Sequence, residues 1–240
     1  MFMTEDFEIT KPRHYPKILI VALSVAIFWY LEFLFFYYLV NPGELQLSLI
    51  RSFGIAGTTV IGTALFLSII FKFYPRLAQY WRIRRYLGVT GFILIFFHVG
   101  TVLKLVNFDL AVAFPTLNPF KNPLVFGAIS YVILFIIAII SSDFAMRKLT
   151  PQRWKFIQRF VYLAEIGIIF HFLLLGGAVM KNWAGYLLYF IISLAVLGQI
   201  YWWFKISRQR QFKNAGFYVG VGLLIIAVVV FYFVYQNFWK

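Results

Sequence analysis

Long apolar runs separated by short polar connections dominate the chain. Seven runs are long enough to cross a hydrocarbon layer of about 30 Å as helices that rise about 1.5 Å per residue. They cover residues 18–40, 52–72, 86–106, 124–142, 156–179, 183–204 and 216–236. Because the runs are apolar on all sides and do not alternate, they argue against a lipid-spanning barrel. The pattern predicts an all-α integral membrane protein with seven transmembrane helices.

The polar connections divide the chain into three parts. Residues 1–17 contain His14 between two prolines and are expected to form a cytoplasmic arm. Residues 18–205 hold the first six predicted helices, and residues 206–240 hold a basic connection and the seventh helix. The longest connection, residues 107–123, is too short for a soluble domain.

The basic residues gather on one side of the predicted membrane. Sorting the 22 lysines and arginines by connection places 17 on the side of the N-terminus and 5 on the other side. Such a bias marks the cytoplasmic side of a membrane protein. The sequence therefore predicts a multi-pass protein of the plasma or inner membrane, with the N-terminus inside and the C-terminus outside. The lipid bilayer accounts for the net charge of +14, and no nucleic acid is expected as a partner.

Two of the three histidines lie inside apolar runs. His98 follows Arg84 by 14 residues, about 21 Å along a helix, and His171 lies at a matching depth in the fifth run. The chain contains no cysteine, which excludes disulfides, thiolate chemistry and iron–sulfur ligation. Either histidine alone can be a packing residue. As a pair with no carboxylate or thiolate companion, they favour haem iron held on both axial faces.

Glycines and carboxylates within the spans add further hypotheses. Four glycines could let a flat macrocycle approach the backbone: Gly88, Gly91, Gly100 and Gly167. Three others are interpreted as sites of close helix packing: Gly54, Gly57 and Gly62. Glu32 and Glu165 either contribute to a proton path or quinone pocket, or are neutral groups hydrogen-bonded between helices.

Three sequence motifs carry a family resemblance. They are RRYLGVTGFILIFFH in the third helix, SSDFAMRKL in the turn after the fourth, and RWKFIQRFVYL at the start of the fifth. Over roughly residues 50–205 the chain resembles the ferric-reductase-like transmembrane family. The likeness is greatest to the haem-binding membrane subunits of bacterial periplasmic methionine-sulfoxide reductase systems.

The resemblance implies a six-helix core that carries haem b and passes electrons to an acceptor outside. By position, His98 and His171 match the axial ligands of the haem in the outer leaflet. The chain departs from the family at Gln158, where a histidine usually stands 13 residues before the second ligand. Arg84 occupies the corresponding inner position of the third helix, so one haem is expected rather than two. Thirteen residues turn an ideal helix by about 220°, so an irregularity is expected between Gln158 and His171.

With a single haem in the outer leaflet, the donor is expected to work within the bilayer. A membrane quinol fits this role, as does a flavin such as FMN whose phosphate lies near the basic inner ends of the helices. Arg84, Arg85, Gln158 and Arg159 are the predicted contacts for such a cofactor or for haem propionates. The bias of basic residues toward the cytoplasm also explains the arginines without any ligand.

Three functions remain open from the sequence. The first is an electron-transfer subunit of an oxidoreductase that serves a periplasmic or extracellular reductase, such as a methionine-sulfoxide reductase. The second is a self-sufficient ferric or metal reductase in which residues 107–123 bind ferric chelates. The third is a haem-free membrane scaffold or transporter, in which the histidines are structural and Glu32 or Glu165 lines a polar path.

Overall fold

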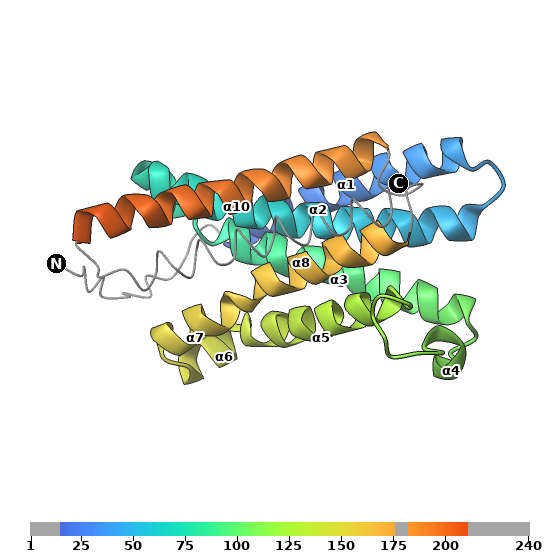
Figure 1. Ribbon diagram of the computed structural model, residues 1–240. Helices are drawn as coiled ribbons and strands as arrows, with labels where there is room; N and C mark the ends of the chain where they lie inside the picture. Colours follow the sequence, from blue (N-terminus) through green and yellow to red (C-terminus); the bar gives the residue numbers. More distant parts are fainter. Residues whose placement is uncertain (1–14, 176–181, 211–240) are drawn as a thin grey trace. The chain divides into compact units, whose positions relative to one another are not determined.

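The computed structural model describes residues 15–175 and 182–210, and every regular element within them is helical (Figure 1). The elements are α1 (Tyr15–Val40), α2 (Leu45–Phe73), η1 (Pro75–Tyr80), α3 (Ile83–Leu105), α4 (Leu110–Ala113), α5 (Leu124–Ile140), α6 (Asp143–Lys148), α7 (Pro151–Gln158), α8 (Phe160–Leu174) and α10 (Trp183–Arg210). The predicted all-α class is confirmed for this part of the chain.

Among the described residues, five helical segments are long and apolar enough to cross a membrane. They are Pro16–Val40, Leu45–Phe73, Ile83–Leu105, Gln152–Leu174 and Trp183–Trp202. The sixth predicted span corresponds to α5, a shorter apolar helix of 17 residues. The seventh predicted span, residues 216–236, lies outside the described residues, as does His14. The count of seven therefore stays a prediction, while the helices have the character of a multi-pass membrane protein.

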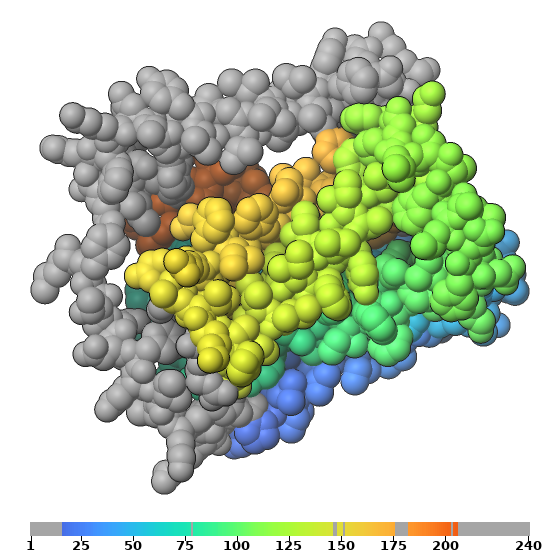
Figure 2. Space-filling model, turned by 90° about the horizontal axis from the view of Figure 1, so that it is seen from below, coloured from blue at the N-terminus to red at the C-terminus, as the bar shows by residue number. Residues whose placement is uncertain are grey.

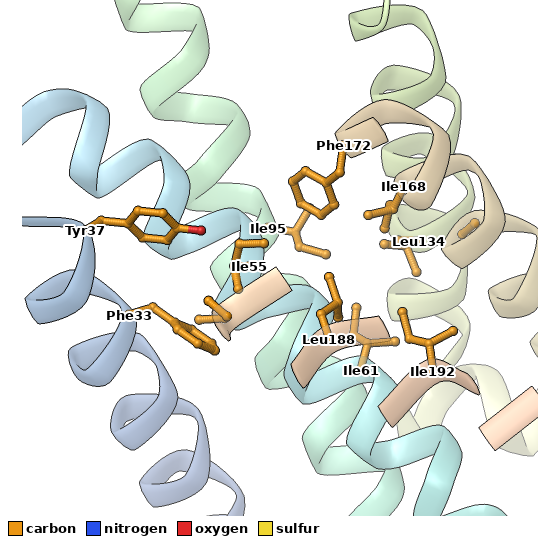
Figure 3. Packing of buried hydrophobic residues seen from close by; sticks show 13 residues of the cluster. Phe33, Tyr37, Ile55, Ile61, Ile95, Leu134, Ile168, Phe172, Leu188 and Ile192 are labelled. Atoms are coloured by element: carbon orange, nitrogen blue, oxygen red, sulfur yellow. The ribbon is translucent and has the colours of Figure 1, made fainter. Parts of the chain in front are cut away.

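The helices of the first compact unit, which ends at Ile192, pack around a shared apolar core. Figure 3 shows side chains from α1, α2, α3, α5, α8 and α10 converging there, among them Phe33, Ile61, Ile95, Ile168 and Leu188. Many large apolar side chains on the other helix faces are exposed, as expected for surfaces that contact lipid. The residues after Ile192 belong to a second compact unit.

Helices α2 and α3 pack closely against each other at two glycines. A Cβ added at Gly57 would lie 2.6 Å from Cγ1 of Ile95 and 2.9 Å from the carbonyl oxygen of Gly91. The two backbones can approach this closely only because neither glycine has a side chain. The predicted packing role of Gly57 is confirmed.

The fifth predicted span is not one continuous helix. It divides into α7 and α8 at Arg159, immediately after Gln158. The amide of Tyr162 donates to the carbonyl of Arg159 at 3.1 Å, a tighter turn than that of an α-helix. The irregularity expected between Gln158 and His171 is thus confirmed, and it lies at Arg159.

Candidate functional site

The two histidines of the apolar spans meet between α3 and α8. The ring centroids of His98 and His171 are 6.4 Å apart, and the ring planes are inclined by 76°. His171 is buried and His98 is half-buried. The structure therefore brings together the two residues that the sequence placed at matching depths.

Each imidazole is held by a backbone carbonyl of a neighbouring helix. Nδ1 of His98 lies 2.8 Å from the carbonyl oxygen of Ile50 in α2. Nδ1 of His171 lies 2.9 Å from that of Pro123, which precedes α5. A carbonyl oxygen only accepts, so Nδ1 carries the proton in both rings and donates. Nε2, on the other side of each ring, keeps its lone pair and is available to a metal.

A glycine makes room for each ring. A Cβ at Gly54 would lie 3.0 Å from Nδ1 of His98, and a Cβ at Gly127 would lie 3.1 Å from Nδ1 of His171. Each glycine stands four residues after the carbonyl that accepts the bond. In both sets the histidine follows that carbonyl by 48 residues. The chain thus builds the same arrangement twice, although the sequence shows no repeat.

The glycines that contact the histidines are not the ones expected to admit a macrocycle. Gly88 and Gly100 face open space, Gly91 packs against Ile61, and Gly167 packs against the side chain of Ser130. None of these four glycines borders the histidine cavity, so their contact with a macrocycle stays a prediction. The expected packing role of Gly54 is confirmed, and the group that it packs against on α3 is an imidazole. Gly127 was missed, and its only signal was its place one turn after Pro123.

The histidines line an apolar cavity of about 240 Å³. Its walls come from α2, α3, α4, α5 and α8, and most of the lining side chains are aliphatic or aromatic. Thr58 is one of the few polar lining residues, and its hydroxyl donates to the carbonyl of Gly54 at 2.8 Å. Such a cavity suits a flat apolar ligand with a few fixed polar contacts.

The spacing of the imidazoles agrees with one metal ion held between them. Two metal–nitrogen bonds of about 2 Å in a line place the ring centroids roughly 6 Å apart. The observed distance is 6.4 Å. Among the described residues, no group of three or more His, Cys, Asp or Glu side chains gathers to hold a metal ion. Two axial nitrogens alone match a metal whose other ligands belong to a macrocycle, as in haem.

The other predicted cofactor contacts lie at the opposite end of α3 and α8, nearer α6 and α7. Arg85 pairs with Asp143 at 2.6 Å, so it holds α6 against α3. Nε2 of Gln158 lies 3.5 Å from Oγ of Ser141. Arg84 and Arg159 both interact electrostatically with Tyr162 and with Lys72. The structure thus brings Arg84 and Arg159 into one basic cluster, while Arg85 and Gln158 contact other groups.

The two carboxylates of the spans lie in different environments. Glu32 is exposed on α1, whereas Glu165 on α8 is buried. No described residue offers a hydrogen-bond partner to either oxygen of Glu165. The hydrogen bond expected between helices is therefore not formed with any described residue. A proton path or quinone pocket at Glu32 or Glu165 stays a prediction.

Comparison with known proteins gives two findings. The family described as Ferric reductase like transmembrane component matches residues 50–169. The match begins at Ile50, includes Gly54, His98 and Gly127, and ends two residues before His171. The chain is also similar to the protein-methionine-sulfoxide reductase heme-binding subunit MsrQ of Enterobacter sp. (strain 638), with 36% identity over 89 residues. That match covers 36% of this chain and 40% of the relative.

Proposed function

Because this chain belongs to the ferric reductase like transmembrane component family, we propose that it binds haem b and passes electrons across a membrane. His98 and His171 are the axial ligands of the haem iron. The observation that carries this assignment is the pair of imidazoles 6.4 Å apart, each with Nδ1 committed to a backbone carbonyl. The relative named as a heme-binding subunit supports the same cofactor.

The bound haem supplies reversible one-electron chemistry. The residues of this chain orient it and exclude water from it. The bonds from Nδ1–H to the carbonyls of Ile50 and Pro123 fix the tautomer and make Nε2 a better donor to iron. Gly54 and Gly127 leave the space that the rings need. The apolar wall of the cavity keeps the dielectric constant around a bound haem low. This low dielectric constant influences the reduction potential of the haem.

Electrons enter from the cytoplasmic side and leave on the outer side. The α6 and α7 end carries most of the basic connections, which supports its cytoplasmic location. From Arg84, at that end, to His98 the helix rises about 21 Å. A quinol or flavin within the bilayer shortens this gap, and the cluster of Lys72, Arg84 and Arg159 offers positive charge to an anionic donor.

The acceptor is a reductase on the outer side, such as a methionine-sulfoxide reductase, and this chain is its electron-transfer subunit in the plasma or inner membrane. The likeness to the Enterobacter subunit supports this choice. Residues 18–205 form the haem-binding core. The expected basic connection and seventh span, residues 206–240, lie largely outside the described residues.

An absorption spectrum tests the cofactor. The purified protein should show a strong Soret band and, after dithionite, the sharp bands of a six-coordinate b-type haem. His98→Ala and His171→Ala should each abolish these bands, whereas His14→Ala in the N-terminal arm should keep them. A wild-type protein that is folded but colourless would favour the haem-free scaffold or transporter instead.

A second experiment tests the acceptor. The reduced protein is placed in liposomes with a ferric chelate outside. If external iron is reduced without any other protein, the chain is a self-sufficient metal reductase. If oxidation of the haem requires an added periplasmic reductase, the chain is a subunit.

A further inference from the structure

The segment Phe108–Asn122, here called the α4 loop, presents many apolar side chains on its surface. Five large ones are between 60% and 78% exposed: Phe108, Leu110, Val112, Leu117 and Phe120. The green part of the surface in Figure 2 includes this segment. Asp109 and Lys121 are its only charged residues. Such an apolar surface on a connecting loop requires an explanation.

The position of the α4 loop along the helix axes gives the first indication of what contacts its apolar surface. α5 has 17 residues and is about 25 Å long, less than the hydrocarbon layer of about 30 Å. It begins directly after Pro123, whose carbonyl accepts from His171. α3 continues past His98 to Leu105, about 10 Å further. The α4 loop therefore lies beyond the end of α5 and at the level of the last turns of α3.

Several polar side chains of the α4 loop form hydrogen bonds within the loop itself. Oδ1 of Asp109 accepts from the amides of Ala111 at 2.8 Å and Val112 at 3.3 Å. The side-chain amide of Asn122 donates to the carbonyls of Ala113 at 3.0 Å and Thr116 at 3.3 Å.

Two further polar side chains of the loop form such bonds. Oδ1 of Asn118 accepts from the amide of Phe120 at 3.0 Å, and Oγ1 of Thr116 accepts from the amide of Asn118 at 3.2 Å. Three prolines, at positions 115, 119 and 123, have no amide hydrogen to satisfy. These bonds reduce the number of unpaired polar groups in the loop, which lowers the cost of placing it beside lipid.

The α4 loop also borders the histidine cavity. Ala113 and Phe114 belong to the cavity wall, as does Leu110, which is partly exposed as well. Both helices that the loop joins carry exposed apolar side chains, such as Phe96 on α3 and Ile129 on α5. We propose that the α4 loop is a re-entrant segment in the membrane interface. Its exposed apolar side chains contact lipid acyl chains, and its inner side separates the histidine cavity from water.

One consequence of this placement rests on the proposed function. If the cavity holds haem, the loop keeps water-soluble chelates away from it, so electrons leave through a docked protein. The placement of the loop itself does not depend on haem and can be measured without it.

The absence of cysteine from the chain makes a direct measurement possible. Leu117→Cys and Phe120→Cys are each spin-labelled, and the protein is placed in lipid nanodiscs, where both membrane faces are accessible. Collisions of the label with oxygen, which concentrates in lipid, are compared with collisions with a water-soluble nickel chelate. Ile136→Cys, exposed on α5, is the lipid control, and Glu44→Cys, exposed at the same end of the bundle, is the water control.

Labels at 117 and 120 should behave like the label at 136, with oxygen relaxing them more strongly than nickel. Labels that behave like the one at 44 would overturn the proposal and would leave the apolar surface free for a soluble partner. If either variant does not fold, Val112→Cys reports from the same surface. A colourless protein with lipid-like labels would contradict only the haem assignment, and a haem-loaded protein with water-exposed labels would contradict only this placement.

Discussion

At the scale of single residues, the carbonyls of Ile50 and Pro123 determine which nitrogen of each histidine is free. A neutral imidazole has one donor and one acceptor nitrogen, and the bond at Nδ1 leaves Nε2 as the acceptor. The bonds from Nδ1 restrain the rotation of both rings. A restrained side chain loses less conformational entropy when its Nε2 binds a ligand.

The glycines beside the rings give the first prediction. In Gly54→Ala and Gly127→Ala, the new Cβ would lie 3.0 to 3.1 Å from Nδ1, so the ring must shift and its bond to the carbonyl weakens. We expect haem affinity to fall on the order of tenfold, as for other groups that orient metal ligands. The measurement is a haem titration of each apo-variant. Gly88→Ala, which adds a Cβ in open space, is the matched control and should bind like wild type.

The buried carboxyl of Glu165 gives a second prediction. Both of its oxygens lack partners, and a buried unpaired polar group costs about 1–3 kcal/mol. Glu165→Leu should therefore raise the free energy of unfolding by about 1–3 kcal/mol. Thermal unfolding in detergent, followed by circular dichroism, would measure the change. Lower stability would instead indicate that Glu165 has a polar partner, such as water.

At the scale of helices, the crossing of α2 and α3 sets where the histidine site can form. Ile50 and Gly54 reach His98 only because Gly57 and Gly91 let the two helices approach closely a turn or two away. The close packing of α2 against α3 is thus required for the histidine site as well as for the fold.

Substitution at this crossing gives a third prediction. Gly57→Ala should lower the free energy of unfolding by about 1–3 kcal/mol, because its Cβ would meet backbone as well as Ile95. Gly62→Ala is the matched control, since its Cβ would come no nearer than 3.3 Å to the side chain of Ile191. Equal thermal stability of the two variants would contradict the close crossing.

The break at Arg159 shows what the sequence predicts about one helix and what it leaves open. The separation of 13 positions between Gln158 and His171 predicts an irregularity, because a regular helix would turn the two side chains to different faces. The position of the break was not predictable. It depends on how α7 packs at the end of α5, where Trp154 donates to the carbonyl of Ile140 at 3.2 Å.

At the scale of the whole molecule, the orientation in the membrane follows from the distribution of charge. We expect the α1–α2 connection outside and η1 inside. In intact cells, Glu44→Cys should react with a membrane-impermeant maleimide, and Arg76→Cys should react only after the membrane is permeabilised. Both residues are exposed, so the reverse pattern would invert the topology and the direction of electron transfer.

The number of haems is the last prediction. At the end of the bundle near α6 and α7, Arg84 and Gln158 offer no second pair of imidazoles, and Gln158 contacts Ser141. Pyridine haemochrome analysis of the purified wild-type protein should therefore give one haem per chain. Two haems per chain would require a ligand other than the histidines of the described helices.

The sequence alone determined the properties that depend on distance along the chain. Span lengths, the all-α class and the matching depth of His98 and His171 all follow from a fixed rise per residue. The sequence could not determine which face of each helix packs against the other helices. A helix that is apolar on all sides has no amphipathic pattern to distinguish its faces. The sequence therefore did not indicate that Gly54 and Gly127 pack against the imidazoles. The pairing of each histidine with a carbonyl 48 residues earlier was decided only by tertiary packing, which sets the rotation and crossing of neighbouring helices.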